Sequence, residues 1–565
     1  MTWTPRPGRG RPRPFILGAL LLLLPVSPLP GRTARRKEAP SEEAALAALE
    51  KLRAFQEKVD SPAQAGQRGR AGLEAFMSLE ERRAALRVVK QAWAARNRRP
   101  CPRLLSALES LRKRYAWDCS RPLRVAWDVL PLLAASLDQE LALQVPPERM
   151  KPHPAARRFP GPVPPGAPRV TAEIQVDPSV PRWRSTGLYA PPGEPVRVTF
   201  PGGIRPGRYR VIVGCHTDNV ARRPRWARFP RISRSFPVER GGTLTVGNVF
   251  GGLIYVDVRK TAAGGPPFRV KIQGAVEAPF FVLGKTTLRE WKTSVRNRPA
   301  PFGEIAGERL ILSLPSSVLR ELDDPEAAAR FWDRVVAAQD DLAAYPRRAR
   351  PERFVFDRQI SAGYMHSGYP LMGPVSAAPA AVDAEGLMEK GNWGMFHEIG
   401  HNHQLLHFGT YANPWTFDGS IEVTVNIFAS YTYVAVLKKP ERMGHQHWRP
   451  DLLAENLRKS YSGPETPYAE RSYREKCLFW VHLIEEFGWN TLKKVFAEYA
   501  GLPRKARPRT NPAKRSLLLE VYSRCAGRDL RPLFAGWGVE TSRAARRAVE
   551  RLGLPAWRPR IPLEN

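Results

Sequence analysis

One pentapeptide, His397-Glu398-Ile399-Gly400-His401, constrains the fold of this chain more than any other feature. It reads H-E-x-x-H, and residues four apart on a helix share a face. The two imidazoles can therefore bind one metal ion only if the segment is helical. Glu398 then falls beside that face, where its carboxylate can act on a coordinated water. Gly400 would let another segment approach closely. The alternative is a chance match, with two histidines hydrogen-bonded near a helix surface.

A hydrolytic zinc site needs three protein ligands and one open position for water. The segment after Ser420 can supply the third ligand. Ser420 can cap a helix, and the residues from Ile421 onward are almost wholly apolar, which predicts a buried helix. Glu422 is the only acidic residue of that run, and a buried carboxylate without a partner is costly, so we expect it to bind the metal. The alternative is that Glu422 only complements the positive end of the helix.

Other side chains near these segments are candidates for supporting roles. Asn426 lies four residues after Glu422 and could hydrogen-bond the far nitrogen of a ligand histidine, or equally cap a neighbouring carbonyl. His403 points to another side of the motif helix, and we interpret it as structural. The candidates for an oxyanion donor are Tyr431, Tyr433 and His407, for which packing or a surface position is the alternative. The residues that could line a substrate cleft are His366, Tyr369, Asn392 and Trp393, the last of which fits a core position equally well.

The motif HEIGHNHQ, followed after 20 intervening residues by Glu422 in SIEVTVNIFASY, resembles the enhancin-like and mucin-degrading zinc metallopeptidases, peptidase family M60 of the gluzincin group. RWRSTGLYAPPGEPVRVTF and GNVFGGLIYVDV are similar to the β-rich domain that precedes the catalytic part of that family. The resemblance implies that His397, His401 and Glu422 bind one zinc ion and that Glu398 is the general base. It also implies a glycoprotein substrate, often a mucin with O-linked glycans. The expected reaction is peptide-bond hydrolysis by a zinc-activated water.

The chain as a whole is expected to be a multidomain α+β protein. Apolar spacings of three and four predict helices near the N-terminus, whereas alternation in VRVTF, YRVIV and LIYVDV predicts a β-sandwich. The expected parts are a signal peptide (1–31), a helical domain (41–148), a Pro-rich linker (149–169), a β-sandwich domain (170–285), a gluzincin-type zinc metallopeptidase catalytic domain (286–440) and its mainly helical C-terminal part (441–550).

The N-terminus predicts export. Four arginines precede an apolar run from Phe15 to Val26 that is too short to span a bilayer comfortably, and no other segment is apolar enough to cross a membrane. The protein is therefore expected to be secreted or held in the cell envelope, with an uncleaved anchor as the alternative. Export permits disulfides, and sequence proximity suggests Cys101 with Cys119 and Cys477 with Cys525, leaving Cys215 free.

The formal net charge of +35 favours polyanionic partners such as acidic glycans or anionic cell surfaces, although it could equally reflect an Arg-rich composition with solvated faces. No zinc finger or RNA-binding motif is present, so no specific nucleic-acid partner is expected. The alternative function is a non-catalytic surface protein that binds glycans or polyanions through a peptidase-like fold. The oligomeric state is not predicted.

Overall fold

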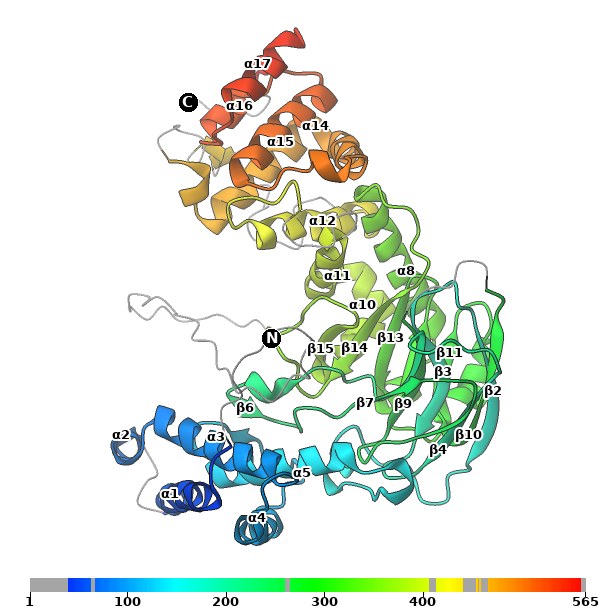
Figure 1. Cartoon of the computed structure of the whole chain (residues 1–565). Coiled ribbons are helices and arrows are strands. Elements are labelled where there is room, and N and C mark those ends of the chain that lie inside the picture. Colours follow the sequence, from blue (N-terminus) through cyan, green and yellow to red (C-terminus); the bar gives the residue numbers. More distant parts are fainter. Residues whose placement is uncertain are drawn as a thin grey trace.

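The computed structural model of the chain describes residues 39–61, 67–259, 265–405, 413–439, 454–455, 457–458 and 466–559 (Figure 1). The predicted signal peptide and His407 lie outside these ranges. Helices form the N- and C-terminal parts, an antiparallel sheet follows the N-terminal helices, and residues 280–435 combine a second sheet with helices. The protein is therefore multidomain and of the α+β type, as predicted. Among the described helices, none combines the length and the apolar character needed to cross a membrane.

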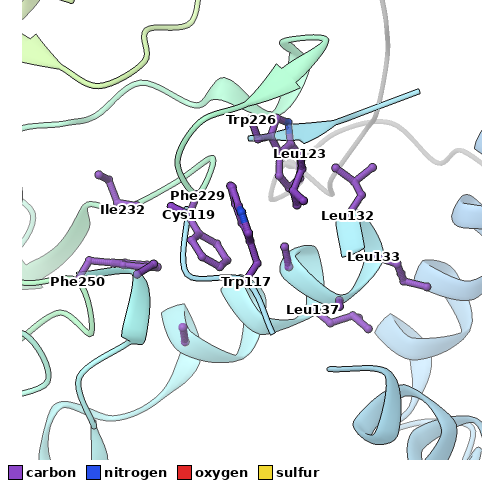
Figure 2. Close-up of a cluster of buried hydrophobic side chains, with 14 of the residues drawn as sticks. Trp117, Cys119, Leu123, Leu132, Leu133, Leu137, Trp226, Phe229, Ile232 and Phe250 are labelled. Atoms are coloured by element: carbon purple, nitrogen blue, oxygen red, sulfur yellow. The ribbon is translucent and has the colours of Figure 1, made fainter. Parts of the chain in front are cut away.

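The N-terminal part consists of helices, of which α1 and α3 begin at serine caps. In α3, Ser78 and Glu81 form a reciprocal capping box that satisfies two orphan backbone N–H groups. The helices are α1 (Glu42–Asp60), α2 (Gln67–Phe76), α3 (Leu79–Ala95), α4 (Pro102–Arg114) and α5 (Val129–Gln144). Their core continues into the β-rich part: Trp117 packs on Phe229 with ring centroids 4.9 Å apart, among the leucines of α5 (Figure 2). The short strand β1 (Leu123–Arg124) also pairs with β6 (Arg225–Trp226).

The Pro-rich segment predicted as a linker is packed against both neighbouring parts. It contains two short 3-10 helices, η2 (Pro147–Arg149) and η3 (Pro154–Arg157), and Ala155 and Phe159 are buried. His153 joins the α5 side chain of Asp138, with 2.7 Å between Nε2 and Oδ2, and its ring contacts Phe229 and Phe250. The Pro-rich segment is therefore a packed connection between the N-terminal helices and the β-rich part.

The predicted strands of residues 170–285 form an eight-stranded antiparallel sheet with the order β7-β5-β9-β3-β10-β4-β8, and β2 also pairs with β10. Its two halves share β10 and enclose one apolar cluster, as in a β-sandwich. The inner strand β9, between β5 and β3, is buried along its whole length because the cluster shared with the N-terminal helices covers its other face. The strands are β2 (Val170–Val176), β3 (Arg182–Ala190), β4 (Val196–Phe200), β5 (Tyr209–Val213), β7 (Arg234–Val238), β8 (Gly242–Val246), β9 (Gly252–Val258) and β10 (Phe268–Glu277).

A second, mixed sheet has the order β11-β12-β13-β14-β15, with β12 and β13 antiparallel and the other pairs parallel. Its strands are β11 (Phe280–Val282), β12 (Phe302–Ala306), β13 (Leu310–Pro315), β14 (Glu352–Asp357) and β15 (Leu371–Pro374). The helices that accompany it are α6 (Leu288–Thr293), α7 (Ser316–Arg320), α8 (Pro325–Leu342), α9 (Ala378–Val382), α10 (Ala384–Lys390), α11 (Trp393–Leu405) and α12 (Ile421–Ala435). In Figure 1, α8, α11 and α12 lie between this sheet and the C-terminal helices.

The C-terminal part is helical, as predicted for the portion that the structure describes. It contains α14 (Tyr473–Ala500), α15 (Asn511–Ala526), α16 (Arg531–Gly536) and α17 (Arg543–Arg551) around an apolar core that also includes residues of α8 and α12. Gly488 interrupts α14 with a φ of 76°, a conformation that favours glycine. Tyr473, at the start of α14, reaches back to α12.

The expected disulfides are wrong, because all five cysteines are free thiols. Four are buried, and Cys525 is half-buried with its Sγ 3.4 Å from Glu498 Oε1. Burial raises the pKa of Cys477 to about 12. Nearness in sequence does not bring two Cβ atoms to the separation of about 3.8 Å that a disulfide needs.

Candidate metal centre

Two helices, α11 and α12, cross at Gly400. A Cβ at this position would lie only 3.0 Å from both Phe428 Cβ and Val425 Cγ2, so glycine allows a closer approach than any other residue. The side of α11 that lies opposite its two motif histidines is apolar, and its residues Met395, Phe396 and Ile399 are fully buried. The close crossing brings the first turn of α12 beside the histidine face of α11.

The crossing places the three residues predicted as metal ligands together. Glu422 Oε2 lies 3.2 Å from His397 Nε2 and 3.4 Å from His401 Nε2, and one donor atom from each residue lies within 4.8 Å of the others. Zinc bound at about 2.0–2.1 Å in a tetrahedral site would separate its ligand atoms by about 3.3–3.4 Å. Two nitrogens and one carboxylate at this spacing fit a zinc ion.

Two amides fix the orientation of the histidines. His397 donates from Nδ1 to Asn426 Oδ1 at 2.9 Å, and His401 donates from Nδ1 to Gln404 Oε1 at 2.6 Å. Because an amide oxygen only accepts, each Nδ1 carries a proton and each Nε2 faces Glu422. There a neutral ring offers its lone pair to a metal, whereas a protonated ring donates to the carboxylate. Gln404 is itself held by bonds from Nε2 to Ile421 O (2.9 Å) and Thr424 Oγ1 (2.7 Å).

The electrostatics of the cluster show that protons compete with a metal for the same atoms. Hydrogen bonds from His397 and His401 hold the pKa of Glu422 well below its usual range. Although burial opposes it, bonding to Glu422 and Gln404 raises the pKa of His401. The Glu422 side chain is 62% exposed. Burial was therefore the wrong reason to expect that Glu422 binds the metal. Glu422 reaches the histidines because it lies in the first turn of α12. Ser420 occupies the N-cap position without making a side-chain cap bond.

Glu398 lies beside the cluster and is partly buried. Burial raises the pKa of its carboxyl, and the nearby Glu422 adds to this, while positive charge on His397 or His401 opposes it. A carboxylate that must take up and return a proton works best with a pKa closer to neutrality than that of a free glutamate. The environment of Glu398 shifts its pKa in that direction.

The residues predicted to line a cleft, to act as oxyanion donors or, for His403, to be structural separate into two groups. His366 and Tyr369 belong to a loop that lies on α11: Met365 fits against Gly394, and Gly368 exchanges hydrogen bonds with the Asn402 side chain at 3.0 and 2.9 Å. The other candidates make contacts elsewhere in the protein. Tyr431 donates to Asp341, Tyr433 donates to Lys390 O, Trp393 packs near Tyr433, Asn392 caps α11 by accepting from Met395 N, and buried His403 donates to Ile399 O.

Three participants were missed from the sequence. Gln404 sits three residues after His401, a spacing that could have indicated its role. Asp218 comes from the loop after β5, and its Oδ2 lies 2.8 Å from His366 Nε2, while His366 Nδ1 faces Ser367 O at 2.9 Å. Both ring nitrogens thus face acceptors, and although burial opposes it, Asp218 raises the pKa of His366. Tyr473 accepts a hydrogen bond from Asn426 Nδ2. Neither long-range pair has a local sequence signal.

Comparison with known proteins identifies the family. Residues 274–538 match the family described as Peptidase M60, enhancin and enhancin-like, and residues 165–273 match the N-terminal domain of M60-like peptidases. The chain is 33% identical to TRPM8 channel-associated factor 3 of Mus musculus, over 70% of this chain and 42% of that protein. The chain thus spans about two fifths of the length of the curated relatives it matches.

Solved structures share the fold at lower identity. A functionally unknown conserved protein from Bacillus anthracis aligns with a TM-score of 0.57 and 22% identity, covering 70% of this chain and 81% of that one. IMPa from Pseudomonas aeruginosa, solved with an O-glycopeptide, aligns with a TM-score of 0.55 and 16% identity, covering 85% of this chain and 62% of that one. With the two matched regions adjoining along the chain, the protein belongs to the enhancin and enhancin-like M60 peptidase family.

Proposed function

We propose that this protein is a zinc-dependent endopeptidase that hydrolyses peptide bonds in glycosylated proteins. The observation that carries the proposal is the donor geometry, in which two Nε2 atoms with fixed tautomers stand 3.2 and 3.4 Å from one carboxylate oxygen. His397, His401 and Glu422 would hold one zinc ion. When bound, zinc would act as a Lewis acid and lower the pKa of water toward neutrality.

In this proposal the reacting proton passes through Glu398. Its carboxylate takes the proton from the attacking water and returns it to the leaving amine, a task that its raised pKa supports. Asn426 and Gln404 keep the histidine rings in place during the reaction. Asp218 raises the pKa of His366, and a protonated His366 would add positive charge to the side of the site where Glu398 lies, which would favour negative charge developing on the scissile carbonyl.

A glycosylated substrate is supported by relatives and by the surface beside the site. IMPa has been solved with an O-glycopeptide and with T-antigen. Two large aromatic side chains are exposed on segments that contact the site: Tyr364, 67% exposed and two residues before His366, and Tyr473, 44% exposed at the start of α14 and bonded to Asn426. Aromatic faces suit the apolar faces of sugar rings. Such a substrate fits a secreted or cell-envelope protein.

A second candidate is a binding function without turnover. Relatives at 33–35% identity are named TRPM8 channel-associated factors, a name that describes association with a channel. In that case the same surface would recognise a protein or glycan and leave it intact.

Cleavage of an O-glycosylated protein by the wild type and by Glu398→Gln separates the two candidates. Endopeptidase function predicts discrete fragments with the wild type and none with the variant, at equal zinc content. If a broad glycoprotein panel stays intact with zinc-loaded wild type, the endopeptidase proposal fails and the binding function replaces it.

A further inference from the structure

Five arginines gather where the loop carrying Tyr369 meets the sandwich. This arginine cluster comprises Arg182, Arg184, Arg348, Arg350 and Arg353. The Arg350 guanidinium carbon lies 4.1 Å from the centroid of the Tyr369 ring, and that of Arg182 lies 5.8 Å from it. Arg184 lies two residues further along β3 than Arg182, and the other three come from β14 and the segment before it.

The cluster holds more positive than negative charge. Buried Arg353 pairs with buried Glu304, Arg350 pairs with Glu352, and Arg348 pairs with both Glu352 and Asp340. In the described part of the chain, neither Arg182 nor Arg184 has a carboxylate within 4.0 Å. Arg184 donates only to the carbonyl of Val180, at 2.7 Å.

This imbalance has an electrostatic consequence. Burial, together with repulsion from Arg348, Arg182 and Arg353, lowers the pKa of Arg350 to about 10, although Tyr369 opposes the shift. Burial also lowers the pKa of Arg184. Because burial removes water from these guanidiniums and neighbouring arginines repel Arg350, an incoming anion would stabilise their charged forms.

The cluster is tied to the helix that carries the metal-binding histidines. Asn402, directly after His401, donates from Nδ2 to Glu352 Oε2 at 3.2 Å and to Gly368 O at 2.9 Å. Gly368 precedes Tyr369. Arg182 is exposed and adopts a φ of 71°, an uncommon conformation for a residue other than glycine, so its backbone is held in a costly state beside the ring. A group bound at Tyr369 would therefore sit close to a substrate lying across α11.

We propose that Arg182, Arg184 and Arg350, with the ring of Tyr369 as an apolar floor, form a substrate subsite for a carboxylate group. The inference rests on the proposed function, because the group recognised belongs to the protein or glycoprotein bound at the metal centre. The forked guanidinium matches a planar carboxylate in two parallel hydrogen bonds. Two sources carry this group: an acidic sugar such as sialic acid, or the side chain of an acidic residue.

Binding to the catalytically inactive Glu398→Gln protein, loaded with zinc and measured by isothermal titration calorimetry at physiological ionic strength, tests the proposal. The four ligands are a sialylated O-glycopeptide, its desialylated counterpart, an unglycosylated peptide with one glutamate, and the same peptide with glutamine. The added variants are Arg182→Gln with Arg184→Gln, and as a matched control Arg269→Gln, an exposed arginine on β10 of the same sandwich. A further variant, Arg182→Lys with Arg184→Lys, keeps the charges and removes the forks.

We expect the double glutamine variant to bind one acidic ligand about 10- to 100-fold more weakly, as the loss of charged hydrogen bonds predicts, with the neutral counterpart unchanged. The acidic ligand that responds identifies the source of the carboxylate. The lysine variant should bind the acidic ligand with intermediate affinity, and Arg269→Gln should bind it as tightly as the parent protein. The proposal is overturned if acidic and neutral ligands respond equally, if Arg269→Gln has the same effect, or if the parent protein binds none of the four ligands.

Failure of the proposed function would look different. If wild type cleaves no glycoprotein but arginine-dependent binding of the acidic ligand persists, the subsite stands and the endopeptidase proposal falls. If the wild type cleaves the glycoprotein but the arginine variants bind the acidic ligand as the parent does, the endopeptidase proposal stands and the subsite proposal falls. Thermal unfolding of each variant checks that the sandwich is intact.

Discussion

The amides that orient the histidines give the sharpest prediction. Asn426→Leu removes the oxygen that accepts from His397 Nδ1 at 2.9 Å, and Gln404→Leu removes the acceptor of His401 Nδ1 at 2.6 Å. Each change leaves a sheltered N–H without its partner, and it frees the ring to rotate or to place its proton on the metal-facing nitrogen.

The expected magnitude follows from that geometry. Leaving a buried donor unsatisfied costs about 1–3 kcal/mol, which corresponds to about 5- to 150-fold in a dissociation constant. Outer partners of metal-binding histidines typically contribute 10- to 100-fold in affinity. We therefore expect each variant to bind zinc 10- to 100-fold more weakly. Asn426→Asp keeps an acceptor oxygen, so it should bind at least as tightly as wild type.

The assay is zinc affinity by competition with a chromogenic chelator at fixed pH. Tyr431→Phe is the matched control, because Tyr431 lies on the same helix but donates to Asp341, away from the cluster. Wild-type affinity in both leucine variants would refute the reasoning. So would an equal loss in Tyr431→Phe, since the effect would then come from general destabilisation of α12.

Three further predictions concern the scaffold. Gly400→Val should destabilise the protein by about 1–3 kcal/mol in denaturant unfolding, since its side chain would overlap α12; unchanged stability would mean that the helices do not cross there. Glu304→Gln should cost about 3–5 kcal/mol because it leaves buried Arg353 without a counter-charge, whereas Glu173→Gln at an exposed pair should cost under about 1 kcal/mol. Burial lowers the pKa of His216 to about 4, so the unfolded chain takes up a proton near pH 6.5 that the folded chain refuses, and stability should fall by about 3 kcal/mol between pH 6.5 and 4. A His216→Phe variant should flatten the dependence of the unfolding free energy on pH, measured by denaturant unfolding. An unchanged pH dependence would show that His216 is not its cause.

Much of the secondary structure could be predicted because its cause is local. VRVTF became β4, with alternate residues buried, and H-E-x-x-H lies within the single helix α11. The crossing at Gly400 was also foreseeable, because a glycine amid apolar residues indicates close approach. The features that the sequence did not predict depend on tertiary packing. The Pro-rich segment is packed, the thiols are unpaired, and Glu422 is exposed.

At the candidate site, the sequence indicated which side chains would meet but gave only part of their surroundings. Asn426 was foreseeable because helical spacing connects it to Glu422. The contact between Asp218 and His366 joins residues 148 positions apart, and the arginine cluster combines β3 with β14. Such pairings follow from how the two sheets stack, and a single sequence does not encode them in any short pattern.

The central claim is that His397, His401 and Glu422 bind zinc, and metal content measured by inductively coupled plasma mass spectrometry on the purified chain tests it most directly. The account predicts about one zinc per chain in the wild type, with most of it lost in His401→Ala and retained in Glu398→Gln. A folded wild type that holds no zinc after zinc is supplied, or a His401→Ala variant that retains it fully, would contradict the account.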